Sequence, residues 1–372
     1  MRSIALVLFA IGCHGFDPAD DRPAVESVEL HSADRFQWES RAADVRVGMW
    51  AGMALNPLPP RAPLNAVIHG RRERAGYSVE NVSFESLPGV FVSGNLFRPL
   101  EHIGRVPAIL HPHGHFPEDG WTARTRPDQQ MTCAHLAQMG AVCFNWDMVG
   151  WGEMSQLDHG VPYAMALQLW NGMRAIDFVE TLPEVDANRI AVTGASGGGT
   201  QALLLGALDP RIAAVAPVVM VSAGWAGGCD CETGMPIRDD TGSNNAEIAA
   251  LIAPRPALFV SDGADWTQTF PSDDFPYLQT IWNLYGAEPL VENVHLADEG
   301  HDLGPSKRAA LYDFFARTFG LRALPLDRTQ DPPEGLPLEP FDSLTVFDAA
   351  HPRPDRALTD ADAVANELYA SM

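Results

Sequence analysis

The stretch IAVTGASGGGTQALLLGAL, from Ile190 to Leu208, decides the fold. It begins as an apolar, β-branched run typical of a buried strand and ends as a leucine-rich run typical of a helix. Between the runs lies Gly194-Ala195-Ser196-Gly197-Gly198, which has the form Gly-x-Ser-x-Gly. A serine on so tight a strand-to-helix turn projects its hydroxyl outward, and glycines are needed because side chains beside it would clash across the turn. The stretch predicts a nucleophilic serine, with a glycine-rich phosphate loop or a plain turn as alternatives.

The flanking sequence predicts an α/β fold with a mostly parallel central sheet. Two alternating segments, Tyr77–Phe84 and Val90–Phe97, predict an antiparallel hairpin before that sheet. Strands and helices then alternate, which is the pattern of a parallel sheet flanked by helices. We predict strands at 106–110, 141–146, 190–195, 212–219, 256–260 and 290–294, and helices at 38–55, 128–139, 162–181 and 306–319.

Composition limits the partners. The formal net charge is −23, so nucleic acid and anionic membrane surfaces are poor partners, since both reward basic patches. The hydrophobic content of 46% and the charged content of 20% describe a globular chain with a large core. The oligomeric state does not follow from the sequence.

The N-terminus has the form of an export signal. Arg2 precedes the short apolar run Ile4–Gly12, which ends at Cys13. Ala10-Ile11-Gly12-Cys13 is similar to a bacterial lipoprotein processing site, so a lipid anchor on Cys13 is the one membrane contact we expect. The expected location is periplasmic, outer-membrane-anchored or secreted. The domain prediction is a signal at 1–15, a tether and helix at 16–58, the α/β domain that contains Ser196 at 59–320, and a proline- and aspartate-rich tail at 321–372.

A serine needs a base to take its proton and an acid to orient that base. In this fold the order along the chain is serine, acid, histidine. His301 follows the last predicted strand, where a loop histidine can reach Ser196. Asp262 and Asp265 both follow the strand at 256–260, and we predict Asp265 because it lies further into the loop. The alternatives are a surface histidine and a turn-forming aspartate.

The oxyanion of the reaction needs two N–H donors. We predict the amides of Gly197, directly after the nucleophile, and of His115, in the loop after the strand at 106–110. His111, His113 and His115 alternate as metal ligands on a strand can, but Pro112 and Gly114 fit a loop better than a rigid ligand strand. The prediction is therefore no metal and no cofactor.

Four further residues are candidates without a settled role. Trp151 and Trp266 follow strand ends and are candidates for the wall of the substrate pocket. Cys229 and Cys231 lie in a long loop and could bind a metal ion, form a disulfide or simply pack. Two cysteines alone do not define a zinc site.

These motifs resemble the α/β-hydrolase superfamily, and more narrowly the bacterial exported esterases of the acetyl xylan esterase-like and dienelactone hydrolase-like kinds. The pieces that carry the resemblance are Tyr77–Pro99, His113-Gly114-His115, Asp147–Glu153, Gly194–Gly198, Thr241–Pro256, Asp265-Trp266-Thr267 and Gly300-His301. The resemblance implies a serine esterase that acts through an acyl-enzyme on acetyl or other short acyl esters of carbohydrate. Acetyl xylan esterases carry Gln after the nucleophile where this chain has Gly197, and dienelactone hydrolases use cysteine where it has Ser196.

Three rival functions stay open at this point. A peptidase of the prolyl-oligopeptidase type would use the same three side chains, but the residues before Tyr77 leave no room for its usual propeller. A non-catalytic carbohydrate-binding protein could keep the fold without the reaction. A metal-dependent hydrolase would use the histidines at 111–115.

Overall fold

The computed structural model describes residues 34–115, 123–224, 229, 231–232, 242–323 and 336–371. The predicted signal at 1–15 and Cys13 lie outside these residues. The sheet is built from β1 (Val67–Arg74), β2 (Tyr77–Leu87), β3 (Val90–Pro99), β4 (Val106–Leu110), β5 (Val142–Trp146), β6 (Val185–Ala195), β7 (Ile212–Val218), β8 (Ala257–Asp262) and β9 (Val291–Leu296). The helices of the same residues are α1 (Arg35–Gly52), α2 (Pro127–Met139), α3 (Ala164–Glu180), α4 (Gly197–Leu208), α6 (Asn245–Ala250), α7 (Phe270–Asp273), α8 (Phe275–Asn283), α9 (Pro305–Phe319), α10 (Phe341–Leu344) and α11 (Ala361–Leu368).

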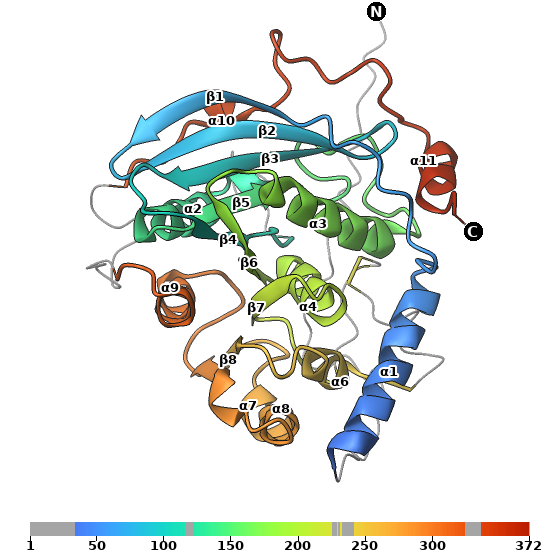
Figure 1. The fold of residues 1–372 in the computed structure, drawn as a ribbon, viewed down its shortest axis with the longest axis vertical. Helices are drawn as coiled ribbons and strands as arrows, with labels where there is room; N and C mark the ends of the chain where they lie inside the picture. The colour runs from blue at the N-terminus through green and yellow to red at the C-terminus, as the bar shows by residue number, and fades with distance from the viewer. Residues whose placement is uncertain are drawn as a thin grey trace, which may run out of the picture.

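The nine strands form one mixed sheet in the order β1-β2-β3-β5-β4-β6-β7-β8-β9 (Figure 1). β1, β2 and β3 pair antiparallel, β3 joins β5 antiparallel, and every later pairing is parallel. In the parallel part Leu110 pairs with both Phe144 and Val192, so β4, β5 and β6 end at the same edge. The α/β fold predicted from the sequence is confirmed. Its topology places the loops after these strands together.

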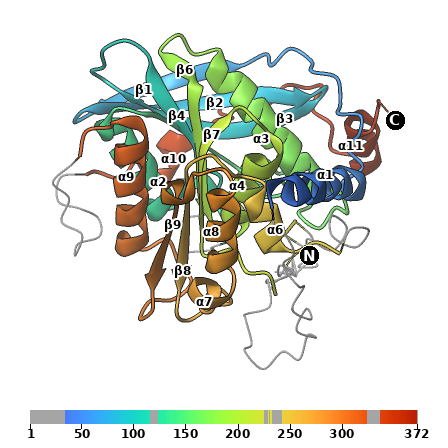
Figure 2. The same ribbon diagram turned by 60° about the horizontal axis from the view of Figure 1, so that its bottom comes forward.

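Helices cover both faces of the sheet (Figure 2). One core lies beneath α1, α3, α4, α6, α8 and α11, and the other lies beneath α2 and α9. The central strands β4 and β5 are buried along their whole length because helices cover both of their faces. Within the described part of the chain, no helix combines the length and the apolar character needed to cross a membrane.

The C-terminal stretch, expected as an appended tail, packs against the antiparallel part of the sheet where the structure describes it. Glu339 pairs with Arg72 and Arg74 of β1, at 3.2 and 2.6 Å. The carbonyl of Thr345 accepts a hydrogen bond from Asn81 of β2, and Leu344 is fully buried. In Figure 1 this segment forms α10 next to β1 and β2 and then continues to α11 at the right of the picture. Residues 336–371 are therefore part of the folded unit.

A buried carboxyl group at the start of α8 gives the fold a pH-dependent stability. Asp274 is only 4% exposed, and its Oδ1 accepts a hydrogen bond from the amide of Ala223 at 3.2 Å. Burial raises the pKa of Asp274 to about 6, although this hydrogen bond partly offsets the effect. The native chain therefore keeps a proton that the unfolded chain releases near pH 4. Its contribution to stability is complete below about pH 4 and is lost as pH rises through about 6.

We expect Asp274→Asn to be more stable than the wild type at pH 8, because the variant buries no charge. The difference in the free energy of unfolding should be on the order of 2–3 kcal/mol at pH 8 and near zero at pH 4. Urea unfolding at pH 4, 6 and 8 measures it. An equal difference at all three values would contradict a raised pKa of Asp274 in the native state.

Candidate active site

Ser196 lies on the turn between β6, which ends at Ala195, and α4, which begins at Gly197. Its backbone has φ 56° and ψ −123°, a strained conformation for a residue with a side chain. The turn is fixed because the Ser196 amide donates a hydrogen bond to the Val218 carbonyl of β7 at 3.0 Å. The serine is thereby held above the end of the sheet, at the N-terminus of a buried helix.

The glycines of the turn are required by close backbone contacts. A Cβ on Gly198 would lie 2.2 Å from the carbonyl oxygen of Pro112, and one on Gly194 would lie 2.5 Å from the carbonyl oxygen of Gly198. Both distances are below any real Cβ contact, and backbone cannot move aside cheaply. The spacing of the motif therefore follows from how closely the loop after β4 approaches the turn.

The structure brings Ser196, Asp265 and His301 together. His301 Nε2 lies 3.0 Å from Ser196 Oγ, and His301 Nδ1 lies 2.7 Å from Asp265 Oδ2. Asp265 follows β8 and His301 follows β9, so the three side chains come from three strand ends on one edge of the sheet. Ser196 and Asp265 are buried, whereas the His301 side chain is 26% exposed. The histidine can therefore pass a proton between the serine and a bound reactant.

Asp265 is held as a carboxylate. Burial opposes its ionisation, but hydrogen bonds from His301 and Thr267 outweigh that effect and hold the pKa of Asp265 below its usual value. Its Oδ1 accepts two hydrogen bonds from Thr267, from the amide and the hydroxyl, both at 2.6 Å. With Oδ1 fixed in this way, Oδ2 is aimed at the imidazole.

The competing aspartate has another partner. Asp262 Oδ2 lies 3.2 Å from the ammonium group of Lys307 in α9, and both side chains are fully buried. Burial, together with the charge of Asp265, raises the pKa of Asp262, and Lys307 counteracts this rise. Of the two aspartates considered from the sequence, Asp265 faces His301 and Asp262 holds a buried cation.

The loop after β4 packs against the turn, as the prediction for the oxyanion donors requires. A Cβ on Gly197 would lie 2.7 Å from Cε1 of the His115 ring. Gly197 is the first residue of α4, where backbone amides have no partner within the helix. The use of the Gly197 and His115 amides as oxyanion donors stays a prediction.

The histidines of this loop do not share a ligand site. His111 Nδ1 contacts the Thr193 carbonyl at 3.2 Å, and His113 Nε2 accepts a hydrogen bond from the Met148 amide at 3.0 Å. Burial lowers the pKa of His111 to about 4 and that of His113 to about 3, so both rings are neutral. They support neighbouring loops, and only His115 reaches a cluster of other ligand-type side chains.

The loop after β5 is fixed by a buried ionic network. Asp147 Oδ2 contacts the guanidinium of Arg124 and accepts hydrogen bonds from the Ser93 hydroxyl at 2.8 Å and the Glu153 amide at 2.9 Å. Gly152 leaves room for this carboxylate, since a Cβ there would lie 2.2 Å from Asp147 Oδ1. The network holds the loop that carries Trp151.

The two tryptophans proposed for the pocket have different neighbours. Trp266 is half-buried, its ring centroid lies 4.5 Å from that of His301, and its Nε1 donates to the Met220 carbonyl at 3.0 Å. Trp151 packs edge-on against His115 and His159, with centroids 5.7 and 5.9 Å away. Trp266 therefore stands beside the base, and Trp151 stands beside the histidine cluster.

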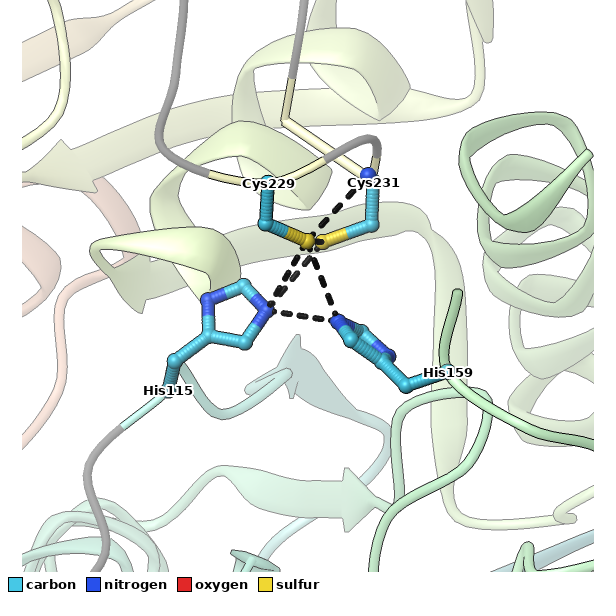
Figure 3. Close-up of side chains that lie close together, drawn as sticks. All are labelled: His115, His159, Cys229 and Cys231. Atoms are coloured by element: carbon cyan, nitrogen blue, oxygen red, sulfur yellow. Dashed lines mark hydrogen bonds between the residues drawn. The ribbon is translucent and has the colours of Figure 1, made fainter. Parts of the chain in front are cut away.

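Sequence reasoning missed His159 as a site residue. Its Nε2 lies 2.9 Å from His115 Nε2 and 3.2 Å from Cys229 Sγ, and Cys231 completes the group (Figure 3). The only signal in the sequence is the Cys-x-Cys pair, since the two histidines lie in separate segments far from it. The fold is needed to show that these residues meet.

Known proteins resemble this chain along most of its length. A family model described as "Glucuronyl esterase, fungi" matches residues 155–231. A 4-O-methyl-glucuronoyl methylesterase 1 from Wolfiporia cocos is 25% identical and covers 80% of this chain and 78% of its own. Among solved structures, Methylesterase BT1017 is 38% identical, with a TM-score of 0.82, over 93% of this chain and 78% of its own.

A glucuronoyl esterase from Solibacter usitatus shares the fold, with a TM-score of 0.57 and 16% identity over 82% of this chain and 99% of its own. The hydrolase and esterase classes expected from the sequence are confirmed by these likenesses. The identity and coverage shared with Methylesterase BT1017 are those of one family. This chain therefore belongs to the α/β-hydrolase carbohydrate esterases, in the family of Methylesterase BT1017.

Proposed function

We propose that this chain hydrolyses the methyl ester of a uronic acid residue in a polysaccharide, with Ser196 as nucleophile, His301 as base and Asp265 as the orienting acid. The observation that carries the proposal is the position of His301, whose two ring nitrogens contact Ser196 and Asp265 at 3.0 and 2.7 Å. This is the arrangement that activates a serine for acyl transfer.

The reaction runs in two balanced steps. Ser196 Oγ attacks the ester carbonyl while His301 Nε2 takes its proton, and the histidine returns that proton to the departing methanol oxygen. A water molecule then attacks the uronoyl-Ser196 ester, again with His301 as base, and releases the uronic acid and the free serine. In both steps Asp265 stabilises the charged imidazole, and the amides of Gly197 and His115 bind the oxyanion.

The relatives favour a uronoyl ester over the acetyl ester that the sequence predicted. Methylesterase BT1017 and the 4-O-methyl-glucuronoyl methylesterase from Wolfiporia cocos are both named for a methyl ester, and the second for a sugar acid. In an acetyl ester the sugar leaves as the alcohol, whereas in a uronoyl methyl ester the sugar stays on the serine and methanol leaves. The site must then accept a sugar ring on the acyl side of the ester. We propose that this sugar ring packs against Trp266, which is half-buried beside His301.

The choice of ester can be tested directly. We expect methanol release from the methyl esters of glucuronic or galacturonic acid oligosaccharides, with kcat/KM about 10²-fold above acetate release from acetylated xylan. Methanol and acetate are measured in parallel with the same enzyme preparation. Faster acetate release would replace the proposal with an acetyl esterase, and cleavage of a peptide amide in place of all esters would replace it with a peptidase.

The location remains part of the proposal. We propose an exported enzyme, because Arg2 precedes a short apolar run that ends before Cys13, and because a polysaccharide substrate would be met outside the cell.

A further inference from the structure

Four ligand-type side chains meet next to the candidate active site (Figure 3). His115 comes from the loop after β4, His159 precedes α3, and Cys229 and Cys231 follow β7. Their Nε2 and Sγ atoms all lie within 4.8 Å of one another. The sulfur atoms of the two cysteines are 3.0 Å apart, beyond the covalent distance of about 2.05 Å, and neither is in a disulfide. Three segments distant in sequence thus supply two imidazole nitrogens and two thiol sulfurs to one point.

The separations suit one small ion at the centre. The contacts between these atoms range from 2.9 Å, between the two Nε2 atoms, to 3.7 Å, between Cys229 Sγ and His115 Nε2. Ligands of a tetrahedral zinc ion, with bonds of about 2.0–2.3 Å, lie about 3.3–3.8 Å from each other. Shifts of less than about 1 Å would therefore place all four atoms at bonding distance from a common centre.

Both imidazoles are already oriented toward that centre. His159 Nδ1 lies 2.6 Å from the Val149 carbonyl, to which it donates, and His115 Nδ1 lies 3.3 Å from Glu232 Oε1. When Nδ1 carries the hydrogen, Nε2 presents its lone pair, which is the tautomer a metal ligand needs. A carbonyl and a carboxylate behind the ligand histidines are the usual supports of a metal site. These contacts distinguish the cluster from a chance meeting of buried side chains.

We propose that His115, His159, Cys229 and Cys231 bind one Zn²⁺ ion in a closed tetrahedral site. Two nitrogen and two sulfur ligands in this geometry select zinc over calcium or magnesium, which prefer oxygen. Four protein ligands leave no open coordination position, so the ion is structural and takes no part in the hydrolysis. The prediction of no metal rested on the grouping of His115 with His111 and His113, and the structure gives those two histidines other partners.

The site would fix the loop that faces the nucleophile. A Cβ on Gly197 would lie 2.7 Å from the His115 ring and 3.0 Å from Glu232 Oε1, so the cluster rests directly on the start of α4. Zinc would join this loop to the segments that carry His159 and the cysteines. By fixing this loop, zinc would also position the His115 amide for catalysis, and that effect rests on the proposed function. Zinc binding itself does not rest on it.

The test measures zinc in the purified full chain, by elemental mass spectrometry after expression with zinc. We expect about one ion per chain in the wild type. Cys231→Ser and His159→Gln should lose it and unfold at lower temperature. Cys133→Ser, which changes another buried cysteine, is the matched control and should keep its zinc. Glu232→Gln should keep all four ligands but bind zinc about 10–100-fold more weakly in a chelator competition.

Cobalt gives a second readout that does not depend on activity or on the folding of a variant. Co²⁺ exchanged into the wild-type chain should show the strong visible absorption of tetrahedral cobalt with thiolate ligands. A wild type without zinc after expression with zinc, or a disulfide between Cys229 and Cys231 found by peptide mapping, would overturn the proposal. Full zinc content in both ligand variants would overturn it as well. Zinc without ester hydrolysis would support the site and contradict only the proposed function.

Discussion

Replacing Ser196 with alanine should lower kcat by about 10⁶ while the protein stays folded. The variant removes the nucleophilic oxygen, which lies 3.0 Å from His301 Nε2. Alanine should fit the turn, because the strain at φ 56° is the same for both residues and the site is buried. The measurement is methanol release under saturating ester, together with the melting temperature.

The control for this variant is Ser272→Ala, which changes an exposed serine of α7 whose hydroxyl donates to the Thr269 carbonyl and to Asp273. We expect it to match the wild type in both measurements. Turnover by Ser196→Ala within tenfold of the wild type would remove Ser196 from the reaction and with it the acyl-enzyme mechanism.

Replacing Asp265 with asparagine should lower kcat by about 10⁴ with little change in KM. The asparagine amide can donate to His301 Nδ1, which would leave Nε2 protonated and unable to accept the serine proton. It also removes the negative charge that stabilises the imidazolium in the transition state. The two hydrogen bonds from Thr267 to Oδ1 can persist, so the variant should fold.

The matching variant Asp262→Asn tests whether the second aspartate acts in stability and not in catalysis. It weakens the buried pair with Lys307, so the expected loss is stability, on the order of 1–3 kcal/mol, with kcat within about threefold of the wild type. The reverse pattern, a large loss of kcat in Asp262→Asn and a small one in Asp265→Asn, would show that the roles of the two aspartates are exchanged.

The sequence predicted which side chains meet at the site where a local pattern and a topological rule agreed. The strand, glycine turn and helix around Ser196 are local features, and the order serine, acid, histidine follows from parallel strands that end at one edge. We predicted Asp265 over Asp262 only because Asp265 lies further along the chain beyond the end of the strand. The structure shows why Asp262 does not face His301: it forms an ion pair with Lys307 of α9. No sequence pattern links these two residues.

Elements without apolar periodicity could not be predicted. β1 reads VIHGRRER and is exposed or half-buried along its length, so its charged residues give no strand signal. It forms because β2 offers a free edge, and Arg72 and Arg74 both form ion pairs with Glu339 of the C-terminal stretch. The prolines and aspartates of the C-terminal stretch gave no sign of that pairing.

The histidine–cysteine cluster was beyond sequence reasoning for a different reason. His115 and His159 stand 44 residues apart, and Cys231 lies 116 residues from His115, so no motif spacing joins them. The loops after β4 and β7 meet only because strand order brings β4, β6 and β7 side by side. A site of this kind follows from the order of the strands in the sheet and not from the spacing of residues in the sequence.

The most direct measurement is the labelling of the intact chain with a fluorophosphonate, followed by mass spectrometry of its peptides. A serine activated by His301 should take up one phosphonyl group per chain on Ser196, and the label should be absent from Ser196→Ala. We expect this result in the wild type and much slower labelling in Asp265→Asn. An unlabelled wild type, or a label on another residue, would contradict the claim that this chain is a serine esterase acting through Ser196.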